Sequence, residues 1–466
     1  MILFITSVLL LILGYFTYAK LVEKVWGVDE SLETPAIKYN DGIDYVKMPL
    51  WRIFLIQFLN IAGLGPVFGA ILGAVYGPVA LLWIVFGCIF AGGVHDYLVG
   101  MISVRHNGKS IVFITEKLFG KYFKIIFLLF FMGLLLLLGT VFAINPAKML
   151  ANLSHTPLIW WIIAVFGYYF LATLLPIDKI IGKFYPYFAA LLVIMTALLM
   201  TVLAFSGKPL YPHLTFNNLH PQNVSIFPIL FITIACGAIS GFHATQTPIM
   251  ARCLPNEKYG RMIFYGAMVT EGIIALIWAT LSISFYQETG SLSQAINQLG
   301  QGGVVSEISI GLLGKIGGIL TILSIIILSI TSGDTAFRSI RLTFSEFTNI
   351  DQTKITNRLI LSFVILGCGV LLSKMNLTTL WQYFGWANQA LSTLVLWTIT
   401  YYLSMKQKNY LITLIPALFM TSVVISYILQ VKIGFSYTPE HANIIGITAS
   451  VLTGIVFLFT KDLKNN

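Results

Sequence analysis

Long apolar segments separated by short polar ones dominate the sequence from end to end. Many of them are at least about 18 residues long, enough for an α-helix to cross the roughly 30 Å hydrocarbon core of a bilayer. We predict thirteen such spans, at residues 1–19, 51–75, 78–103, 123–144, 157–175, 185–206, 226–250, 261–286, 308–332, 356–373, 379–403, 410–431 and 441–460. The pattern therefore predicts an all-α, multi-pass membrane protein that has the lipid bilayer as its surroundings.

The composition agrees with this prediction and excludes other classes. Apolar residues make up 57% of the chain and charged residues 10%, against about 25% charged residues in soluble domains. A soluble enzyme, a nucleic-acid-binding protein and a secreted disulfide scaffold are excluded, so nucleic acid is not an expected partner. The cysteines stand singly in or near apolar segments, and we interpret them as small core residues. No metal site or bound cofactor is expected.

Lysine and arginine collect in alternate loops. The loops on one side of the predicted spans carry 23 of these residues, and the loops on the other side carry four. Positively charged residues favour the cytoplasmic side of a membrane. We therefore predict that the N-terminus lies outside and the C-terminus inside.

The span at 51–75 is interrupted near its middle. Asn60, Gly63, Gly65 and Pro66 stand where a simple apolar helix would continue. Glycine permits non-helical dihedral angles, and proline at the start of a half-helix lacks an N–H that would have no partner there. We predict a discontinuous helix. The alternative is a proline-kinked helix whose small residues serve close packing.

The span at 226–250 holds a second group of polar and small residues. Gly237, Ser240, Gly241, His243 and Gln246 follow one another within it, and such residues are costly inside a membrane unless they line a cavity. We predict a second break at Gly237–His243. His243 is either a hydrogen-bonded packing residue or part of a binding site.

Four intact spans separate the two interrupted ones, so the two enter the membrane from opposite sides. This arrangement favours inverted repeats of five spans, at 51–206 and 226–403. A leading span at 1–19, a cytoplasmic loop at 20–50 and two final spans with a short tail at 410–466 complete the division. Each break would direct half-helix N–H groups at the membrane midplane, which favours a small anionic substrate.

Two sets of residues compete for the coupling ion. The hydroxyls of Thr331 and Ser332 could bind Na⁺ together with backbone carbonyls near Asn60–Gly63, unless they bond to their own helix. The alternative is a proton site, for which the ionisable residues within spans are the candidates: His95, Asp96, His243, Glu271 and Asp334. Such residues need a reason to lie in a membrane, so we favour H⁺ over Na⁺. A structural ion pair between spans remains the other interpretation, and Asp334 could pair with Arg338.

Several short segments together resemble the carbon starvation protein A (CstA) family. They are Asp44-Tyr45-Val46, Ile61-Ala-Gly-Leu-Gly-Pro66, Val94-His-Asp-Tyr97, Arg105-His-Asn-Gly-Lys-Ser110, Ser240-Gly-Phe-His243, Asp334-Thr-Ala-Phe-Arg338 and Phe384-Gly-Trp-Ala-Asn-Gln389. They run in the expected order over most of the chain. His95 is a departure, because the family more often has Gln there. The chain resembles a short member that lacks the additional C-terminal part.

The resemblance implies a fold and a function. The family is placed among amino acid–polyamine–organocation (APC) carriers, with a LeuT-like inverted repeat of five plus five spans. It is associated with uptake of pyruvate or peptides across the inner membrane during nutrient limitation, driven by an ion gradient. We therefore predict a symporter of the bacterial inner membrane that works by alternating access. The alternatives are a peptide-specific carrier and a membrane-embedded nutrient sensor; no catalytic constellation indicates an enzyme.

Overall fold

The computed structural model describes residues 2–40, 45–172, 177–207, 215–348, 350–352 and 354–461, with the side chains of 177–184 and 346 excepted. Within these residues every regular element is a helix and no strand occurs. Among the described residues, nine helices are long and apolar enough to cross a membrane, and a bent pair makes a tenth candidate. Residues 462–466 of the predicted tail lie outside the described residues.

The N-terminal span is longer than predicted. It consists of α1 (Ile2–Phe16) and α2 (Tyr18–Trp26), followed by the short α3 (Pro35–Lys38). The span continues to Trp26 rather than ending at Ala19, because α2 is amphipathic and buries Val22 and Trp26 while its lysines are exposed. The loop predicted at 20–50 accordingly begins after Trp26.

The first half of the core contains one bent helix and several continuous ones. Its elements are α4 (Leu50–Ala62), η1 (Gly65–Gly69), α5 (Ala70–Ala74), α6 (Val79–Gly87), η2 (Cys88–Gly92), α7 (Gly93–Arg105), α8 (Ile111–Phe119), α9 (Lys121–Ser154), α10 (Leu158–Ala172) and α11 (Ile177–Phe205). The pieces η1 and η2 are π-helical, a geometry that often marks functional sites.

The second half also begins with an interrupted helix. Its elements are α12 (Ile229–Thr233), α13 (Gly241–Ala251), η3 (Glu257–Tyr259), η4 (Arg261–Tyr265), α14 (Gly266–Tyr286), α15 (Thr289–Thr348), α16 (Ile355–Leu372) and α17 (Leu377–Met405). Two glycines with left-handed φ, Gly300 and Gly314, divide α15. The last piece runs unbroken from there to Thr348, well beyond the span predicted at 308–332. The chain ends with α18 (Leu411–Gln430) and α19 (Pro439–Thr460).

Only some of the thirteen predicted spans coincide with described helices that are long and apolar enough to cross a membrane. Three predicted spans coincide with α10, with the α12–α13 pair and with α17, which do not combine sufficient length with sufficient hydropathy. The helix α10 is short, and both the α12–α13 pair and α17 carry buried polar residues. The count of thirteen therefore stays a prediction.

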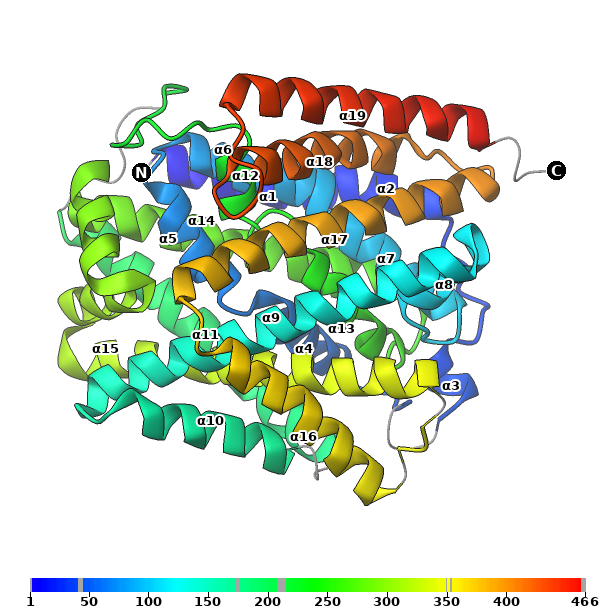
Figure 1. The fold of residues 1–466 in the computed structure, drawn as a ribbon, viewed down its shortest axis with the longest axis horizontal. Coiled ribbons are helices and arrows are strands. Elements are labelled where there is room, and N and C mark those ends of the chain that lie inside the picture. Colours follow the sequence, from blue (N-terminus) through cyan, green and yellow to red (C-terminus); the bar gives the residue numbers. More distant parts are fainter. Residues whose placement is uncertain are drawn as a thin grey trace.

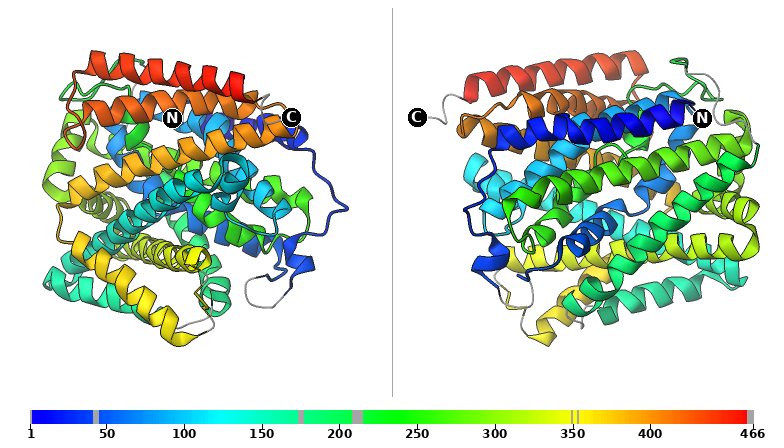
Figure 2. Two further views of the ribbon diagram at one scale, coloured as in Figure 1. Left: turned by 45° about the vertical axis from the view of Figure 1, so that its right-hand side comes forward. Right: turned by 180° about the vertical axis from the view of Figure 1, so that it is seen from behind.

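The helices run lengthwise through the molecule (Figure 1). Helix α1 begins at one end of the molecule and α19 ends at the other, and α1 packs along α14 at the periphery (Figures 1 and 2). Helices α18 and α19 pack together and against α17 on one flank, while α10 and α16 lie on the opposite one. The bent helix α4 and the half-helix α13 lie at the centre, in contact with each other, and α13 also contacts α7 and α17.

Candidate functional site

The first interrupted helix breaks where the sequence predicted. Helix α4 ends at Ala62, Gly63 has a left-handed φ of 45°, and η1 begins at Gly65 with Pro66 in its first turn. The two halves are bent by 55°. The prediction of a discontinuous helix is confirmed, because only glycine takes the conformation at position 63 without strain.

The second interrupted helix breaks earlier than predicted. Helix α12 ends at Thr233 and α13 starts at Gly241, so residues 234–240 form the break. His243 and Gln246 lie within α13 rather than in the break. The predicted boundaries Gly237–His243 are wrong by a few residues, since Ser240 is extended and α13 begins directly after it.

The two breaks face each other across a close backbone contact. A Cβ atom on Gly65 would lie 2.2 Å from the Cβ of Cys236, and one on Gly69 would lie 2.9 Å from the carbonyl oxygen of Thr233. Real Cβ atoms do not approach so closely, so these glycines let η1 touch the second break. Gly237 instead packs against Ala275 of α14.

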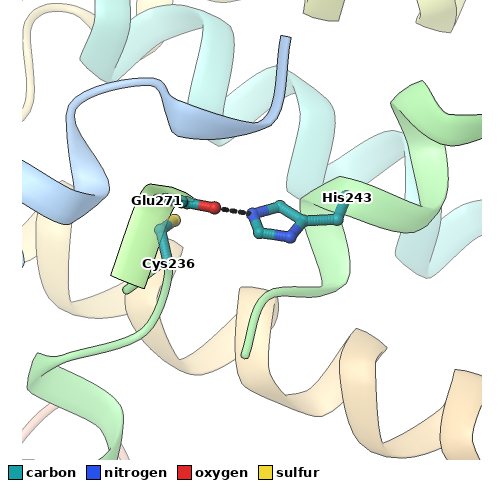
Figure 3. A group of neighbouring side chains, drawn as sticks. All are labelled: Cys236, His243 and Glu271. Atoms are coloured by element: carbon teal, nitrogen blue, oxygen red, sulfur yellow. Dashed lines mark ion pairs between the residues drawn. The ribbon is translucent and has the colours of Figure 1, made fainter. Parts of the chain in front are cut away.

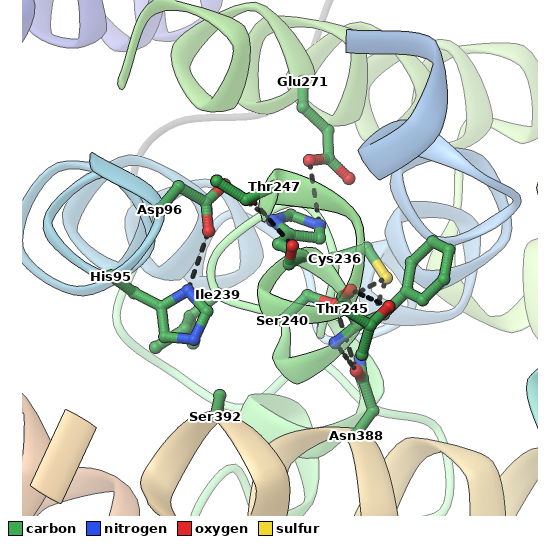
Figure 4. A network of polar contacts seen from close by, with 12 residues as sticks. His95, Asp96, Cys236, Ile239, Ser240, Thr245, Thr247, Glu271, Asn388 and Ser392 are labelled. Carbon is green, nitrogen blue, oxygen red and sulfur yellow. Dashed lines mark hydrogen bonds and ion pairs between the residues drawn. The ribbon is translucent and has the colours of Figure 1, made fainter. Parts of the chain in front are cut away.

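A side chain from α17 caps the second half-helix (Figure 4). Asn388 Oδ1 accepts hydrogen bonds from the Phe242 N–H at 2.8 Å and from the Ser240 hydroxyl at 3.1 Å. The backbone of α17 is also close, because a Cβ on Gly241 would lie 2.4 Å from the Asn388 carbonyl oxygen. One of the amides that the sequence assigned to a substrate anion is thus already bonded within the protein.

Four ionisable side chains that the sequence named separately form one chain of contacts (Figure 4). One carboxylate oxygen of Asp96 lies 2.8 Å from His95 Nδ1, and the other lies 2.8 Å from His243 Nδ1. The opposite ring atom, His243 Nε2, lies 3.3 Å from Glu271 Oε2. All four side chains are fully buried. We call His95, Asp96, His243 and Glu271 the relay.

One contact of the relay, between His243 and Glu271, has no hydrogen bond. An ionised Asp96 accepts an N–H from each imidazole, which fixes the proton of His243 on Nδ1 and leaves Nε2 as an acceptor. The 3.3 Å contact between Nε2 and Glu271 lacks hydrogen-bond geometry, and both Glu271 oxygens have no hydrogen-bond partner among the described residues. A proton on either group would form a hydrogen bond between them once the Glu271 carboxyl group turns towards Nε2. The arrangement can therefore hold or release a proton between His243 and Glu271.

Small residues bring the relay together. Asp96 lies in the first turn of α7, directly after the π-helical η2, and Glu271 lies in α14. A Cβ on Gly92 would lie 2.2 Å from the carbonyl oxygen of Ala238 in the second break. This close approach of η2 to the break places Asp96 beside His243.

Cys236 lies close to the relay (Figure 3). Its sulfur, a His243 ring nitrogen and a Glu271 oxygen all lie within 4.8 Å of one another, a donor set that could hold a metal ion. The sulfur also has partners of its own, since it lies 3.5 Å from Ser240 Oγ and 3.8 Å from Asn388 Nδ2. The thiol thus belongs to the network that caps α13, and its role there was not predicted.

The predicted sodium ligands are partly assembled. The Ser332 hydroxyl lies 3.8 Å from where a Cβ on Gly63 would be, and it has no hydrogen-bond partner among the described residues. Both side-chain polar atoms of the buried Asn60 also lack one. The Thr331 hydroxyl instead donates to the Leu328 carbonyl of its own helix.

Two other candidates lie outside the relay. Asp334 pairs with Arg338 at 3.4 Å, as the spacing suggested, and is not in the relay. Gln246 donates to the Thr245 hydroxyl at 2.8 Å, while its side-chain oxygen has no hydrogen-bond partner among the described residues. Sequence reasoning missed Gln57, which donates to Thr247 of α13 at 3.3 Å. A buried amide in the first interrupted span was the available signal.

The chain matches a known protein family over most of its length. The model described as "Carbon starvation protein CstA" matches residues 1–160, 147–305 and 286–427. The chain belongs to the CstA family. The resemblance found in the short sequence segments is confirmed.

Individual relatives of this CstA-family protein extend the comparison. It is 43% identical over 347 residues to an "Uncharacterized membrane protein" of Haemophilus influenzae, covering 63% of this chain and 94% of the relative. It is 29% identical over 342 residues to the "Pyruvate/proton symporter BtsT" of Escherichia coli, covering 59% and 47%. It is 28% identical over 332 residues to a "Peptide transporter CstA" of Helicobacter pylori, covering 57% and 48%. The chain thus spans about half the length of the two named transporters.

Solved structures support the fold of this CstA-family protein. MhsT in complex with L-phenylalanine matches with a TM-score of 0.59 at 14% identity, over 88% of this chain and 98% of that one. Mhp1, a nucleobase-cation-symport-1 family transporter, matches with a TM-score of 0.57 at 15% identity, over 89% and 93%. Both have the LeuT-like fold.

These findings confirm the broad class of the protein. Its apolar helices and its membrane transporter relatives make it a multi-pass membrane protein, consistent with an inner membrane. The named relatives and the matched structures are transporters and not enzymes. The prediction that the chain is not an enzyme is therefore confirmed.

Proposed function

We propose that this CstA-family protein is a secondary active transporter that couples proton entry to the uptake of pyruvate or a small peptide across a bacterial inner membrane. One observation carries the proposal. A fully buried relay of two carboxylates and two imidazoles joins the half-helix α13 to α7 and α14 in a LeuT-like fold. Ionisable groups at such depth are expensive and mark ion pathways.

Proton coupling requires the ion to bind the alternating states with different free energies. His243 is the central group of the relay. It faces Asp96 of α7, Glu271 of α14 and the Cys236 thiol, and His95 acts on it through Asp96. Because His243 belongs to α13 and Glu271 to α14, a rearrangement of the interrupted helix changes their separation. Proton affinity would then change with the conformational state.

Sodium is the second candidate ion. Asn60 and Ser332 leave buried polar atoms without a hydrogen-bond partner among the described residues, close to the break at Gly63. Oxygen atoms of this kind suit a small cation. We favour H⁺ because the four relay side chains already contact one another, whereas the Thr331 hydroxyl bonds to its own helix.

The finer architecture belongs to the same proposal. We infer thirteen spans arranged as a five-plus-five inverted repeat of the APC type, with the N-terminus outside. An odd number of crossings fits the positions of the start of α1 and the end of α19 at opposite ends of the molecule (Figure 1). The proposed substrate class follows the names of two relatives, a pyruvate/proton symporter and a peptide transporter.

Uptake by the purified protein in liposomes tests the function. Labelled pyruvate and labelled dialanine are offered with an imposed H⁺ gradient, an imposed Na⁺ gradient, or neither. We expect one of the two substrates to accumulate when the outside is more acidic than the inside, with no effect of Na⁺. Accumulation driven by Na⁺ at equal pH would identify Na⁺ rather than H⁺ as the coupling ion. No accumulation under any gradient would contradict the transport function.

A further inference from the structure

A large cavity lined by both polar and apolar residues opens at the end of the molecule that the charge distribution predicts to be outside. Its volume is about 530 Å³, within the range of small-molecule sites. Residues of α5, α9, α12, α15, α17 and α18 line it. The start of α17 lies at the same end of the molecule as the start of α1 (Figure 1). The relay does not line it.

Among the described residues that line the cavity, Lys148 of α9 carries the one permanent charge, and none is an aspartate or glutamate. Lys148 is exposed and forms no ion pair or hydrogen bond with any of the described residues. At the opposite end of the molecule, by contrast, Arg105 is paired with Glu257 and Arg261 with Glu23. An unpaired cation in a recess without acids attracts anions.

Neutral donors line the same cavity as Lys148. Asn297, Gln301 and Gln382 line the cavity with side-chain amides. His220 joins them, because its Nδ1 accepts the Gln222 N–H at 3.2 Å, which places the ring proton of the neutral form on Nε2. Burial lowers the pKa of His220, so that the neutral form prevails at neutral pH. Amide and imidazole N–H groups are the donors that satisfy carboxylate oxygens.

The cavity leads towards the interrupted helices. Leu72 of α5 and Thr233 of α12 line it. The carbonyl of Thr233 lies against Gly69, where the two interrupted helices touch. An anion held in the cavity is thus one layer of residues away from the contact between the two breaks.

We propose that Lys148, with the amides that line the same cavity, forms an outer binding site for the carboxylate of the substrate. The proposal rests on the transport function proposed above and deepens it, since it names the group that the protein recognises first. The Phe242 N–H at the start of α13 already donates to Asn388. Lys148 would therefore supply the positive charge for the carboxylate. Pyruvate and a peptide C-terminus both present this chemistry.

Binding to the purified protein in lipid nanodiscs tests the site without requiring transport. Pyruvate, dialanine and dialanine amide are titrated into the wild-type protein, Lys148→Gln, Lys148→Arg and the matched control Lys432→Gln. The control removes a lysine that is predicted to be on the same side but does not line the cavity. We expect pyruvate, dialanine or both to bind, and Lys148→Gln to weaken binding about tenfold, as for the loss of one hydrogen bond to a charged group. Lys148→Arg should retain most of the affinity, and dialanine amide should bind weakly to every variant.

The outcomes separate this site from the transport function. Equal affinity of Lys148→Gln and Lys432→Gln for every ligand overturns the site, as does binding of dialanine amide as tight as that of dialanine. Absence of carboxylate binding to the wild-type protein also overturns it. Binding that depends on Lys148, in a protein that accumulates no substrate under any gradient, supports the site and contradicts the transport function.

Discussion

The two interrupted helices break for different physical reasons. In the first, Ala62 ends α4 and η1 begins at Gly65, with Gly63 in a left-handed conformation between them. In the second, residues 234–240 separate α12 from α13. The amide of Phe242 at the start of α13 is satisfied by Asn388, from a helix 146 residues further along the chain.

This difference separates a break encoded locally from one encoded by tertiary contacts. Glycine and proline at neighbouring positions are sufficient to interrupt the first helix. The second break needs an acceptor from α17, because a buried N–H without a partner costs free energy. The second half-helix should therefore be the one whose start depends on a distant side chain.

The largest expected effect comes from the contact between the two breaks. Gly65→Ala places a Cβ 2.2 Å from Cys236 Cβ, and overpacking of this kind should lower the free energy of unfolding by about 3 kcal/mol. Cys236→Gly should relieve the clash in the double variant, because the next contact, with Cys236 Cα, is an ordinary 3.5 Å. Unfolding titrations in mixed micelles measure the single variants and the double variant.

Gly133→Ala is the matched control for this pair. Gly133 lies within α9, and a Cβ there would meet nothing within 4 Å, so the substitution should be neutral or should stabilise by up to about 1 kcal/mol. Additive effects of Gly65→Ala and Cys236→Gly would show that the breaks do not touch as described.

A smaller effect is expected at the cap of α13. Asn388→Ala leaves the Phe242 N–H without its acceptor, which should lower the free energy of unfolding by about 2 kcal/mol. Hydrogen–deuterium exchange should increase at the start of α13 and stay unchanged at η1. Thr393→Val is the control about one turn along α17, since among the described residues the Thr393 hydroxyl bonds only to the Gln389 carbonyl of its own helix. Equal exchange at α13 in the two variants would contradict the tertiary origin of the second break.

The same difference explains how far the sequence could predict the structure. The break at Gly63–Pro66 was placed correctly because its cause lies in adjacent residues. The second break was placed a few residues late, since the polar run around His243 was visible but the Asn388 acceptor was not connected to it. The end of the first span was missed because α2 buries only one face.

The relay was predicted in its parts but not as a whole. His95, Asp96, His243 and Glu271 were candidates because ionisable residues are rare in apolar spans. Their assembly depends on contacts such as that of Gly92 with the Ala238 carbonyl, and on Asp96 meeting His243 from 147 residues away. Asp334 met the same criterion of rarity, yet it pairs with Arg338 outside the relay. Rarity therefore selected the ionisable residues of the spans as candidates but could not show which of them lie in contact.

Proton entry during substrate uptake tests the central claim most directly. An inward gradient of the transported substrate is applied to proteoliposomes with equal pH on both sides, and an enclosed pH-sensitive dye records the interior. We expect acidification with the wild-type protein and with the control Glu307→Gln, whose carboxylate bonds to Tyr286 outside the relay. With Glu271→Gln we expect substrate exchange to persist without acidification. Acidification by Glu271→Gln equal to that of the control, or none by the wild-type protein during uptake, would contradict coupling through the relay.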